Sequence, residues 1–438
     1  MKKIISTVIV AVFLLGATSL AALTIEINKS IDKPFPIAVV PFSGPSLQSN
    51  VTDTIATDLS NSGRFEVAAL HELPQKPHES TQINWSKWTA LDTEYLVIGK
   101  VTANSNQTYN VQFQVISQLG NHALTGRVFK NIPADRMNVL GHTIANYVYQ
   151  AVTGQRGYFT TKLAYIDVSD PYNLRKAQYS LIIADYDGQN PQVLLSQKRN
   201  PLASPVWSPD GSQLAYVSYI NGRMAVYSIA LKTGKRTLIA NYPGINSSPA
   251  FVPKSKNLVV ALSKKANSAT TQLYLTKPNV KGVIKQLTYS GINTSPAVSP
   301  DGKLVAFTST RGGQPQIYVM KINGLSAKRL TFSGVQNFDP KFTPDGKDIV
   351  FMHQAESGGA IGIAKLDLKS GEMTMLTNGP VDKSPSVSPD GSMVIYTNTH
   401  EHGALGLGMV SLNGRIHINL PASSHQVNIE SPAWSPFL

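Results

Sequence analysis

Six copies of one motif fix most of the architecture of this chain. Each copy is a short segment, rich in Ser and Pro, that leads into a tight turn; the copies begin at Ser204, Ser248, Ser295, Asp339, Ser384 and Ser431. Successive copies start 44, 47, 44, 45 and 47 residues apart. A period in the forties with several strands per unit is typical of a β-propeller, in which each repeat forms one blade.

The repeat that begins at Ser295 predicts the four strands of one blade. Its first segment, SPAVSP, is extended because each Pro fixes φ and moves its predecessor towards the β region. Pro lacks an N–H for the ladder, which suits an innermost strand with one edge towards the central channel. The segment PDG forms a turn, KLVAFTS and QIYVMKI form the next two strands, and Asn323-Gly324 turns the chain into the outer strand AKRLT.

The phase of the repeats predicts how the ring closes. The first of the second strands, KLAYID from Lys162, has no inner strand before it, and the last inner strand, from Ser431, has no second strand after it. We therefore expect the C-terminal segment to be the inner strand of blade one, which removes the two free edges of an open ring. A linear array of hairpins is the alternative.

The residues before the repeats predict a smaller α/β domain. PIAVVPF predicts a buried strand, and a helix over 50–60, the strand RFEVA and a short helix with Trp85 and Trp88 follow it. Three successive strands come next, and a last helix begins at Pro133 and ends at Gly154. The predicted organisation is a signal peptide, an α/β domain with an N-terminal strand, and an all-β six-bladed β-propeller closed by the C-terminal strand in blade one, over residues 1–21, 22–155 and 156–438.

The first 21 residues have the pattern of a secretory signal peptide. Two lysines precede an apolar run from Ile4 to Leu15, and Ser19 and Ala21 occupy the small-residue positions of a cleavage site. The run is too short to span a bilayer, although a membrane anchor is the alternative. With no Cys in the chain there is no site for lipidation and no disulfide framework. We expect cleavage after about Ala21 and a soluble periplasmic monomer.

The positive charge belongs to the propeller. The net charge of the chain is +13; residues 22–155 hold nine Lys and Arg against ten Asp and Glu, whereas residues 156–438 hold 28 against 16. This excess suits an acidic partner or an anionic surface, and plain solubility is the alternative explanation. Nucleic acid is not expected as a partner, because the basic residues do not cluster with stacking aromatic residues.

The sequence contains few candidates for chemistry. It has no GxSxG elbow, no P-loop and no HExxH, and the one tight His pair, in His400-Glu401-His402, provides two metal ligands without a third. The turn carboxylates repeat because the turn repeats, so we interpret them as Asx turns; they are Asp210, Asp301, Asp345 and Asp390. We therefore expect no catalytic residue, no metal and no cofactor.

The residues just before the inner strands do break the symmetry of the repeats. These pairs differ from blade to blade and are expected to converge at one mouth of the channel, where a partner would be recognised. They are Leu202-Ala203, Asn246-Ser247, Asn293-Thr294, Asn337-Phe338, Asp382-Lys383 and Ile429-Glu430.

Several segments together resemble the TolB family of the Tol–Pal envelope system of Gram-negative bacteria. They are SPVWSPDGSQLAYVS, TSTRGGQPQIYVMKING, the terminal SPAWSPFL, and IAVVPF at the start of the first domain. The turn motif alone is weak, since related repeats occur in propeller peptidases, but the resemblance covers essentially the whole mature chain in domain order and size.

The resemblance implies two partners and no catalysis. The lipoprotein Pal would bind the propeller mouth at Ala203, Ile245, Asn246, Ser248, Thr294 and Ser295, and the membrane-anchored TolA would bind the N-terminal strand at Leu23, Thr24, Ile25, Glu26 and Ile27. In the family pattern an acidic residue can stand at the position of Ser295 and a His at that of Ile245, so polar contacts with Pal would be formed differently here. Membrane association is expected only through these partners.

An exported propeller hydrolase is the alternative function. A propeller peptidase needs a hydrolase domain with a nucleophile elbow, and a metal-dependent hydrolase needs carboxylates and His in the channel. The inner strands instead provide Ser, Pro, Ala, Val and Trp. The sequence therefore favours an adaptor that links Pal to TolA for envelope integrity and for outer-membrane constriction at division.

Overall fold

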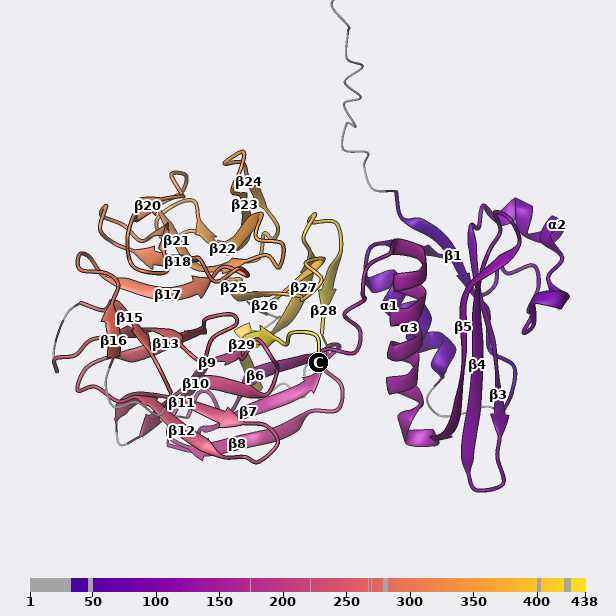
Figure 1. Cartoon of the computed structure of the whole chain (residues 1–438), viewed down its shortest axis with the longest axis horizontal. Helices are drawn as coiled ribbons and strands as arrows, with labels where there is room; N and C mark the ends of the chain where they lie inside the picture. The colour runs from indigo at the N-terminus through magenta and orange to yellow at the C-terminus, as the bar shows by residue number, and fades with distance from the viewer. Residues whose placement is uncertain are drawn as a thin grey trace, which may run out of the picture. The chain divides into compact units, whose positions relative to one another are not determined.

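The computed structural model describes residues 33–45, 50–173, 175–220, 222–266, 268, 270–278, 283–399, 403–420 and 427–438. Pro34–Leu438 form one compact unit, which contains an α/β region followed by a six-bladed β-propeller (Figure 1). The predicted fold class is therefore confirmed.

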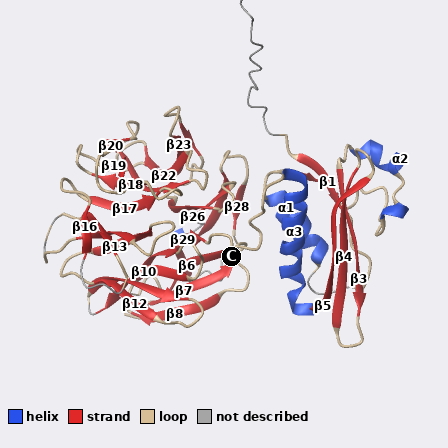
Figure 2. Cartoon of the chain, in the orientation of Figure 1, coloured by secondary structure: helices blue, strands red, loops and turns tan. Residues whose placement is uncertain are grey.

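The α/β region is a five-stranded sheet with two long helices, α1 and α3, against it (Figure 2). The strand order is β2-β1-β3-β4-β5; β1 runs parallel to β2 and β3, and β3, β4 and β5 are antiparallel. The elements are β1 (Phe35–Val39), α1 (Val51–Asn61), β2 (Phe65–Val67), α2 (Trp85–Trp88), β3 (Tyr95–Ala103), β4 (Thr108–Ser117), β5 (His122–Pro133) and α3 (Met137–Thr153), with 3₁₀ turns over Ser80–Gln82, Thr89–Leu91 and Ala134–Arg136.

The local signals explain these helices. Asn50 caps α1 because its side chain accepts a hydrogen bond from the Thr52 N–H at 3.0 Å. Gly154 ends α3 in the left-handed conformation, with φ of 74°. Trp88 is fully buried in the core on the other face of the sheet.

The propeller consists of six four-stranded antiparallel sheets whose inner strands surround a common centre (Figure 1). Blade 1 contains β29 (Val427–Trp434), β6 (Lys162–Ser169), β7 (Gln178–Asp185) and β8 (Gln192–Lys198). Blade 2 contains β9 (Leu202–Trp207), β10 (Gln213–Ile220), β11 (Arg223–Ala230) and β12 (Arg236–Ala240). Blade 3 contains β13 (Asn246–Phe251), β14 (Leu258–Leu262), β15 (Gln272–Thr276) and β16 (Val283–Gln286).

The remaining blades repeat this order. Blade 4 contains β17 (Asn293–Val298), β18 (Leu304–Ser309), β19 (Gln316–Lys321) and β20 (Lys328–Arg329). Blade 5 contains β21 (Gln336–Phe342), β22 (Asp348–Gln354), β23 (Ile361–Asp367) and β24 (Met373–Met375). Blade 6 contains β25 (Lys383–Val387), β26 (Met393–Thr399), β27 (Leu405–Ser411) and β28 (His417–Asn419).

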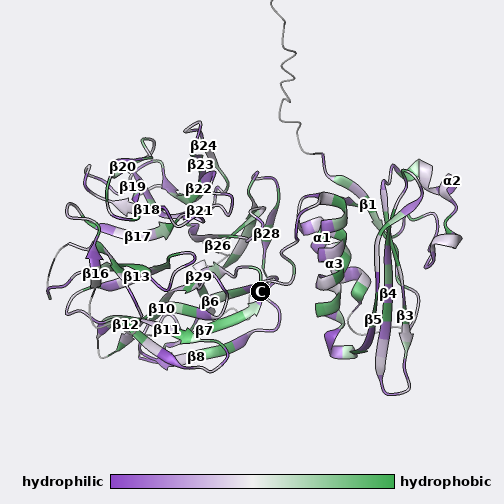
Figure 3. Ribbon diagram, in the orientation of Figure 1, coloured by the Kyte–Doolittle hydropathy of each residue, from purple (hydrophilic) through white to green (hydrophobic). Residues whose placement is uncertain are grey.

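The C-terminal strand closes the ring. It pairs with β6 in an antiparallel ladder that places Glu430 opposite Ile166 and Trp434 opposite Leu163. The predicted closure in blade one is confirmed. Apolar side chains fill the spaces between adjacent blades, and the hydrophobic colour follows strands such as β6 and β7 (Figure 3).

The antiparallel order gives the propeller two different faces. The tight turns between first and second strands and between third and fourth strands lie at one end of each blade, which we call the turn face. The loops that lead into the inner strands, and the connections between second and third strands, lie at the other end, which we call the loop face.

Candidate partner-binding surface on the loop face

The inner strands share one unusual backbone conformation near the loop face. The residue before the first Pro has φ between 47° and 55° in every blade, a left-handed region that costs an L-residue roughly 1–2 kcal/mol. The register with the second strand shifts at the same place, so each inner strand carries a β-bulge. The six left-handed residues are Ser204, Ser248, Ser295, Asp339, Ser384 and Ser431.

Neighbouring blades stabilise this conformation. The Asp339 N–H donates to Oγ1 of Thr308 in the preceding blade at 3.1 Å, and the Ser431 N–H donates to Oγ1 of Thr397 at 3.2 Å. A strained residue persists where the surrounding structure determines its position. The bulged inner strands are therefore fixed by contacts between blades and offer a rigid scaffold.

A buried Asn fixes the loop before the inner strand in three consecutive blades. Asn246 donates from Nδ2 to the carbonyl oxygens of Tyr242 at 2.8 Å and Gly244 at 3.0 Å. Asn293 and Asn337 have no exposed surface either, and each bonds a carbonyl oxygen of its own loop. The sequence analysis placed all three in the varied pairs and named Asn246 as a contact of Pal, but it did not predict their burial.

The predicted Pal-contacting residues fall into two groups. Ala203, Ser248, Thr294 and Ser295 are half-buried on β9, β13 and β17, so three consecutive blades bring them to the loop face. Ile245 is 39% exposed in the loop before β13. Asn246 has no exposed surface, and its side chain is used within the chain; any effect on a partner would pass through the loop that it fixes.

Exposed apolar side chains surround these residues, and sequence reasoning missed most of them. Tyr289 is 76% and Phe332 75% exposed, and Ile292 and Val381 are about as exposed as Ile245. All five lie in loops that lead into inner strands. The recurring segments NYPGIN, TYSGIN and TFSGVQN, each with an aromatic residue, Gly and Asn, could have revealed them. Apolar side chains that gather on one face are typical of an interaction site.

Two cations of the loop face lie against aromatic rings. Nζ of Lys264 is 4.6 Å from the ring centre of Tyr274, and Cζ of Arg311 is 5.1 Å from that of Tyr318. Arg311 also donates to Oδ1 of Asn293 at 3.1 Å, and burial lowers the pKa of its guanidinium. These contacts hold positive charge beside the exposed apolar side chains.

The turn carboxylates have the predicted structural role. Oδ1 of Asp210 accepts a hydrogen bond from the Ser212 N–H at 3.1 Å, and Oδ1 of Asp301 accepts one from the Lys303 N–H at 3.0 Å. The same bond recurs at Asp345 and Asp390. The interpretation of these residues as Asx turns is confirmed.

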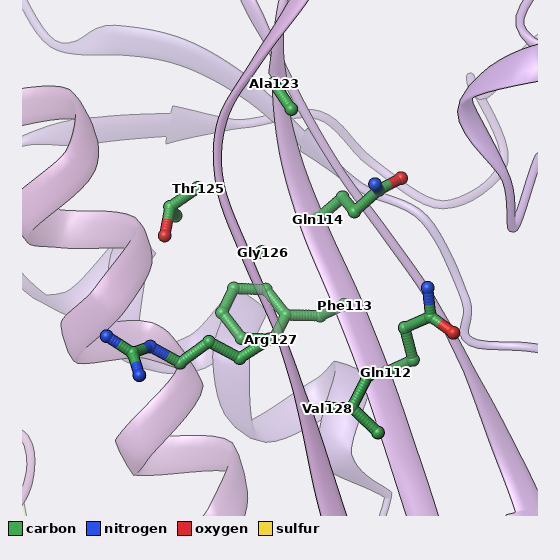
Figure 4. Close-up of a pocket in the computed structure, with 8 residues that line it drawn as sticks. All are labelled: Gln112, Phe113, Gln114, Ala123, Thr125, Gly126, Arg127 and Val128. Atoms are coloured by element: carbon green, nitrogen blue, oxygen red, sulfur yellow. The ribbon is translucent and has the colours of Figure 1, made fainter.

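A shallow pocket of about 400 Å³ lies over β4 and β5 of the α/β region (Figure 4). Its only charged lining residue is Arg127, whose Cζ lies 4.5 Å from the ring centre of Tyr147 on α3. Its lining residues do not include a nucleophile paired with a base. Among the described residues, no three His, Asp or Glu side chains are placed to hold a metal ion.

Some predicted features lie outside the described residues. They are the signal peptide, the N-terminal strand Leu23–Ile27 and His400-Glu401-His402. Within the described ranges, no helix combines the length and the apolar character needed to cross a membrane.

Two family models match the chain. The model of the TolB amino-terminal domain matches residues 23–120, and that of the TolB β-propeller domain matches residues 149–438. The match to the propeller model alone covers more than half of the chain.

Similar proteins match over the full length. Tol-Pal system protein TolB of Francisella tularensis strain SCHU S4 is 40% identical over 442 residues, which cover 100% of this chain and 98% of that protein. The protein of the same name from Hydrogenovibrio crunogenus is 33% identical over 100% of both chains. The crystal structure of TolB from Acinetobacter baumannii is 35% identical, with a TM-score of 0.82, over 93% of this chain and 98% of that one. This chain therefore belongs to the TolB family and is a component of the Tol–Pal system.

Proposed function

We propose that this chain is a non-catalytic periplasmic adaptor. The loop face of blades 2 to 4 binds the lipoprotein Pal, and the N-terminal segment Leu23–Ile27 binds TolA. By linking an outer-membrane lipoprotein to an inner-membrane protein, the adaptor supports envelope integrity and outer-membrane constriction at division. The signal-peptide pattern of residues 1–21 supports the periplasmic location.

The gathering of exposed apolar side chains on the loop face is the observation that carries the proposal. Ile245 and Ile292 directly precede the bulged inner strands β13 and β17, which carry the half-buried Ser248 and Thr294. Tyr289 lies in the loop that leads into β17. A protein interface needs apolar anchors surrounded by polar groups that fix orientation. This face provides both.

Matched Ser-to-Arg substitutions in blade 3 test the binding face. Ser248 is on the loop face, and Ser255 is exposed on the turn of the same blade. Ser248→Arg is expected to block Pal binding sterically, and Ala203→Arg should do the same from blade 2. Ser255→Arg should bind Pal normally in calorimetry, because the added bulk and charge are the same but lie on the turn face. If Ser248→Arg binds Pal normally and Ser255→Arg does not, Pal binds the turn face and the proposal is wrong.

Smaller changes test the polar contacts. Thr294→Ala should weaken binding by about 1 kcal/mol if its hydroxyl forms one buried hydrogen bond with Pal. Higher salt should slow association more than it accelerates dissociation, since long-range charge mainly sets the association rate.

Deletion of Leu23–Ser30 tests the second contact. The segment LTIEI alternates apolar and polar residues, as does a strand that adds to the edge of a partner sheet. The deletion should abolish TolA binding and leave Pal binding and the melting temperature unchanged. Unchanged TolA affinity would exclude this segment as the contact.

A further inference from the structure

Exposed lysines gather on the turn face of blades 2 to 4. They are Lys232, Lys235, Lys254, Lys256, Lys303 and Lys321. The turns of neighbouring blades abut: a Cβ added to Gly302 in blade 4 would lie 3.5 Å from the carbonyl oxygen of Pro253 in blade 3. Nζ of Lys285 in blade 3 also donates to the carbonyl oxygen of Asn323 in blade 4, at 2.8 Å. The turns of blades 3 and 4 therefore form one continuous surface, and Lys232 and Lys235 lie on the same face of the preceding blade.

Little negative charge opposes this surface. Its turns contain Asp210 and Asp301, both of which bond backbone N–H groups of their own turns. Nζ of Lys303 lies 3.4 Å from Oδ2 of Asp301, and both side chains are mostly exposed, so the pair is weak. In the described parts of the chain, Lys254 and Lys256 have no carboxylate within ion-pair distance.

Blade 3 breaks the turn motif at the centre of this surface. Pro253-Lys254-Ser255-Lys256 stands where the other turns have Pro-Asp-Gly, so a negative charge is replaced by a positive one. Lys254 is also left-handed, with φ of 57°, a conformation that favours Gly or Asn. The turn keeps its backbone bond from the Ser255 N–H to the Val252 carbonyl at 3.2 Å. The turn thus keeps its hydrogen bond while the charge is reversed, although the left-handed residue is Lys254 here and the Gly after the Asp in the other turns.

The distribution of charged and apolar side chains on this surface indicates which kind of partner it fits. The charges are spread over the turns of three blades and do not converge on one point, so they match an extended anionic plane better than a single phosphate group. The turns that carry them have no aromatic side chain for stacking on bases. Leu325, 61% exposed, adds an apolar side chain near Lys321, whose N–H donates to the Leu325 carbonyl oxygen at 2.9 Å. Lysines around an exposed apolar side chain are typical of protein surfaces that rest on anionic headgroups.

We infer that the turn face of blades 2 to 4 binds directly to an anionic lipid bilayer. The inference does not rest on the adaptor proposal, which concerns the opposite face. It also differs from the expectation that membrane association passes only through protein partners. On the loop face, by contrast, Lys264 and Arg311 are partly engaged by aromatic rings.

Vesicle sedimentation tests the inference with the purified protein. We expect binding to vesicles of phosphatidylcholine mixed with phosphatidylglycerol, none to phosphatidylcholine alone, and a loss of binding as salt rises. The variant Lys254→Glu/Lys256→Glu/Lys303→Glu should bind at least about a hundredfold more weakly, since each lysine near an anionic surface contributes roughly fivefold. The melting temperature of this variant should equal that of the wild type, because all three side chains are exposed. If the variant melts at a lower temperature, the triple variant with Gln at the same positions is used in its place.

A charge-matched control separates the effect of this surface on vesicle binding from the effect of the net charge of the protein. Lys76→Glu/Lys87→Glu/Lys130→Glu changes three exposed lysines of the α/β region by the same total charge and should keep vesicle binding. An equal loss in both triple variants would overturn the inference, as would equal binding to neutral vesicles. Binding to soluble polyglutamate without binding to anionic vesicles would also overturn it, in favour of an acidic protein.

Discussion

The indole Nε1–H of Trp434 donates a hydrogen bond to Oγ1 of Thr161 at 2.8 Å, so the last strand of the ring is bonded to the segment that leads into its first blade. The Trp434 N–H also donates to Oγ of Ser386 in blade 6 at 2.9 Å. On the other side, Trp207 of blade 2 donates from Nε1 to the Ala433 carbonyl oxygen at 3.0 Å. The closing strand is thus fixed to both neighbouring blades as well as to its own.

Trp434→Ala should destabilise the propeller by about 3–5 kcal/mol, because it leaves a cavity and removes the hydrogen bond to the Thr161 hydroxyl, which keeps its own bond to the Tyr158 carbonyl oxygen. Trp434 is 6% exposed and packs edge-on against Tyr158, with ring centres 5.4 Å apart. Urea unfolding measures the loss. Leu438→Ala is the control, since Leu438 is 55% exposed and its truncation should cost little. Equal effects of the two substitutions would contradict the closing role of Trp434.

Asp382→Asn should stabilise the protein at neutral pH by about 1 kcal/mol. Asp382 is 3% exposed and occupies the position that Asn246, Asn293 and Asn337 hold in blades 3 to 5. An Asn keeps the acceptor for the Gly379 N–H, which bonds Oδ2 of Asp382 at 3.0 Å, and adds a donor for the loop carbonyl oxygens. Thermal melting measures the gain.

The pH dependence of this gain follows from the carboxyl group. Burial raises the pKa of Asp382 above its ordinary value of 3.8, against hydrogen bonds from Thr377 and Gly379. A raised folded pKa lowers stability as pH rises from 3.8 through the folded value, so the advantage of Asn should shrink in acid. The reverse change, Asn246→Asp, should destabilise, because its carboxylate would face the carbonyl oxygens of Tyr242 and Gly244 that Asn246 now bonds. Stabilisation by Asn246→Asp would refute the argument.

The fold was predictable because the same sequence pattern occurs six times in the chain. Pro positions, turns and alternating strands agree in every copy, and the missing inner strand before Lys162 requires Ser431–Leu438 to supply it. The start of α1 and the end of α3 were equally plain, since Asn50 and Gly154 are strong local signals. The predicted start of the last helix at Pro133 is wrong, because Pro133 is extended and ends β5, and a 3₁₀ turn precedes the start of α3 at Met137.

The candidate site was less predictable because its features depend on contacts between blades. Nothing in the sequence around Ser248 indicates a left-handed residue before Pro; the bulge that produces it forms only when inner and second strands pair. The burial of Asn246 likewise depends on a loop that folds back over its side chain. Tyr289 and Phe332 were detectable, since both precede Gly in a recurring segment.

Ser248→Val should destabilise blade 3 by roughly 1–2 kcal/mol more than Ser247→Val. Ser248 has φ of 49°, where a β-branched side chain clashes with the backbone, whereas Ser247 is not among the residues of positive φ in the same strand. Both serines are half-buried, so the difference in stability between the two variants reports the cost of the left-handed backbone at Ser248. Chemical unfolding of the two variants checks it, and equal stabilities would mean that the bulge relaxes at no cost.

The buried His142 should make the protein lose stability in alkali. Its Nδ1 lies 2.7 Å from Oδ2 of Asp58 on α1, and its Nε2 lies 3.5 Å from Oδ2 of Asp187 in blade 1, where Tyr186 also donates to Asp58. Burial alone would lower the pKa of His142, but the hydrogen bonds and charges of Asp187 and Asp58 outweigh it and raise the pKa to about 10. The imidazolium therefore holds two carboxylates from different parts of the chain.

The sign of the pH effect follows from the raised pKa. The stabilisation is complete below the ordinary His pKa of 6.5 and is lost as pH rises towards about 10. His142→Asn should cost about 3–5 kcal/mol at neutral pH, because a buried carboxylate loses its partner, and should remove most of this alkaline loss. Urea unfolding at a series of pH values measures both effects, with His122→Asn, an exposed position on β5, as the control that should leave the profile unchanged. A wild-type protein whose stability is flat between pH 6.5 and about 10 would show that His142 is neutral in the folded state.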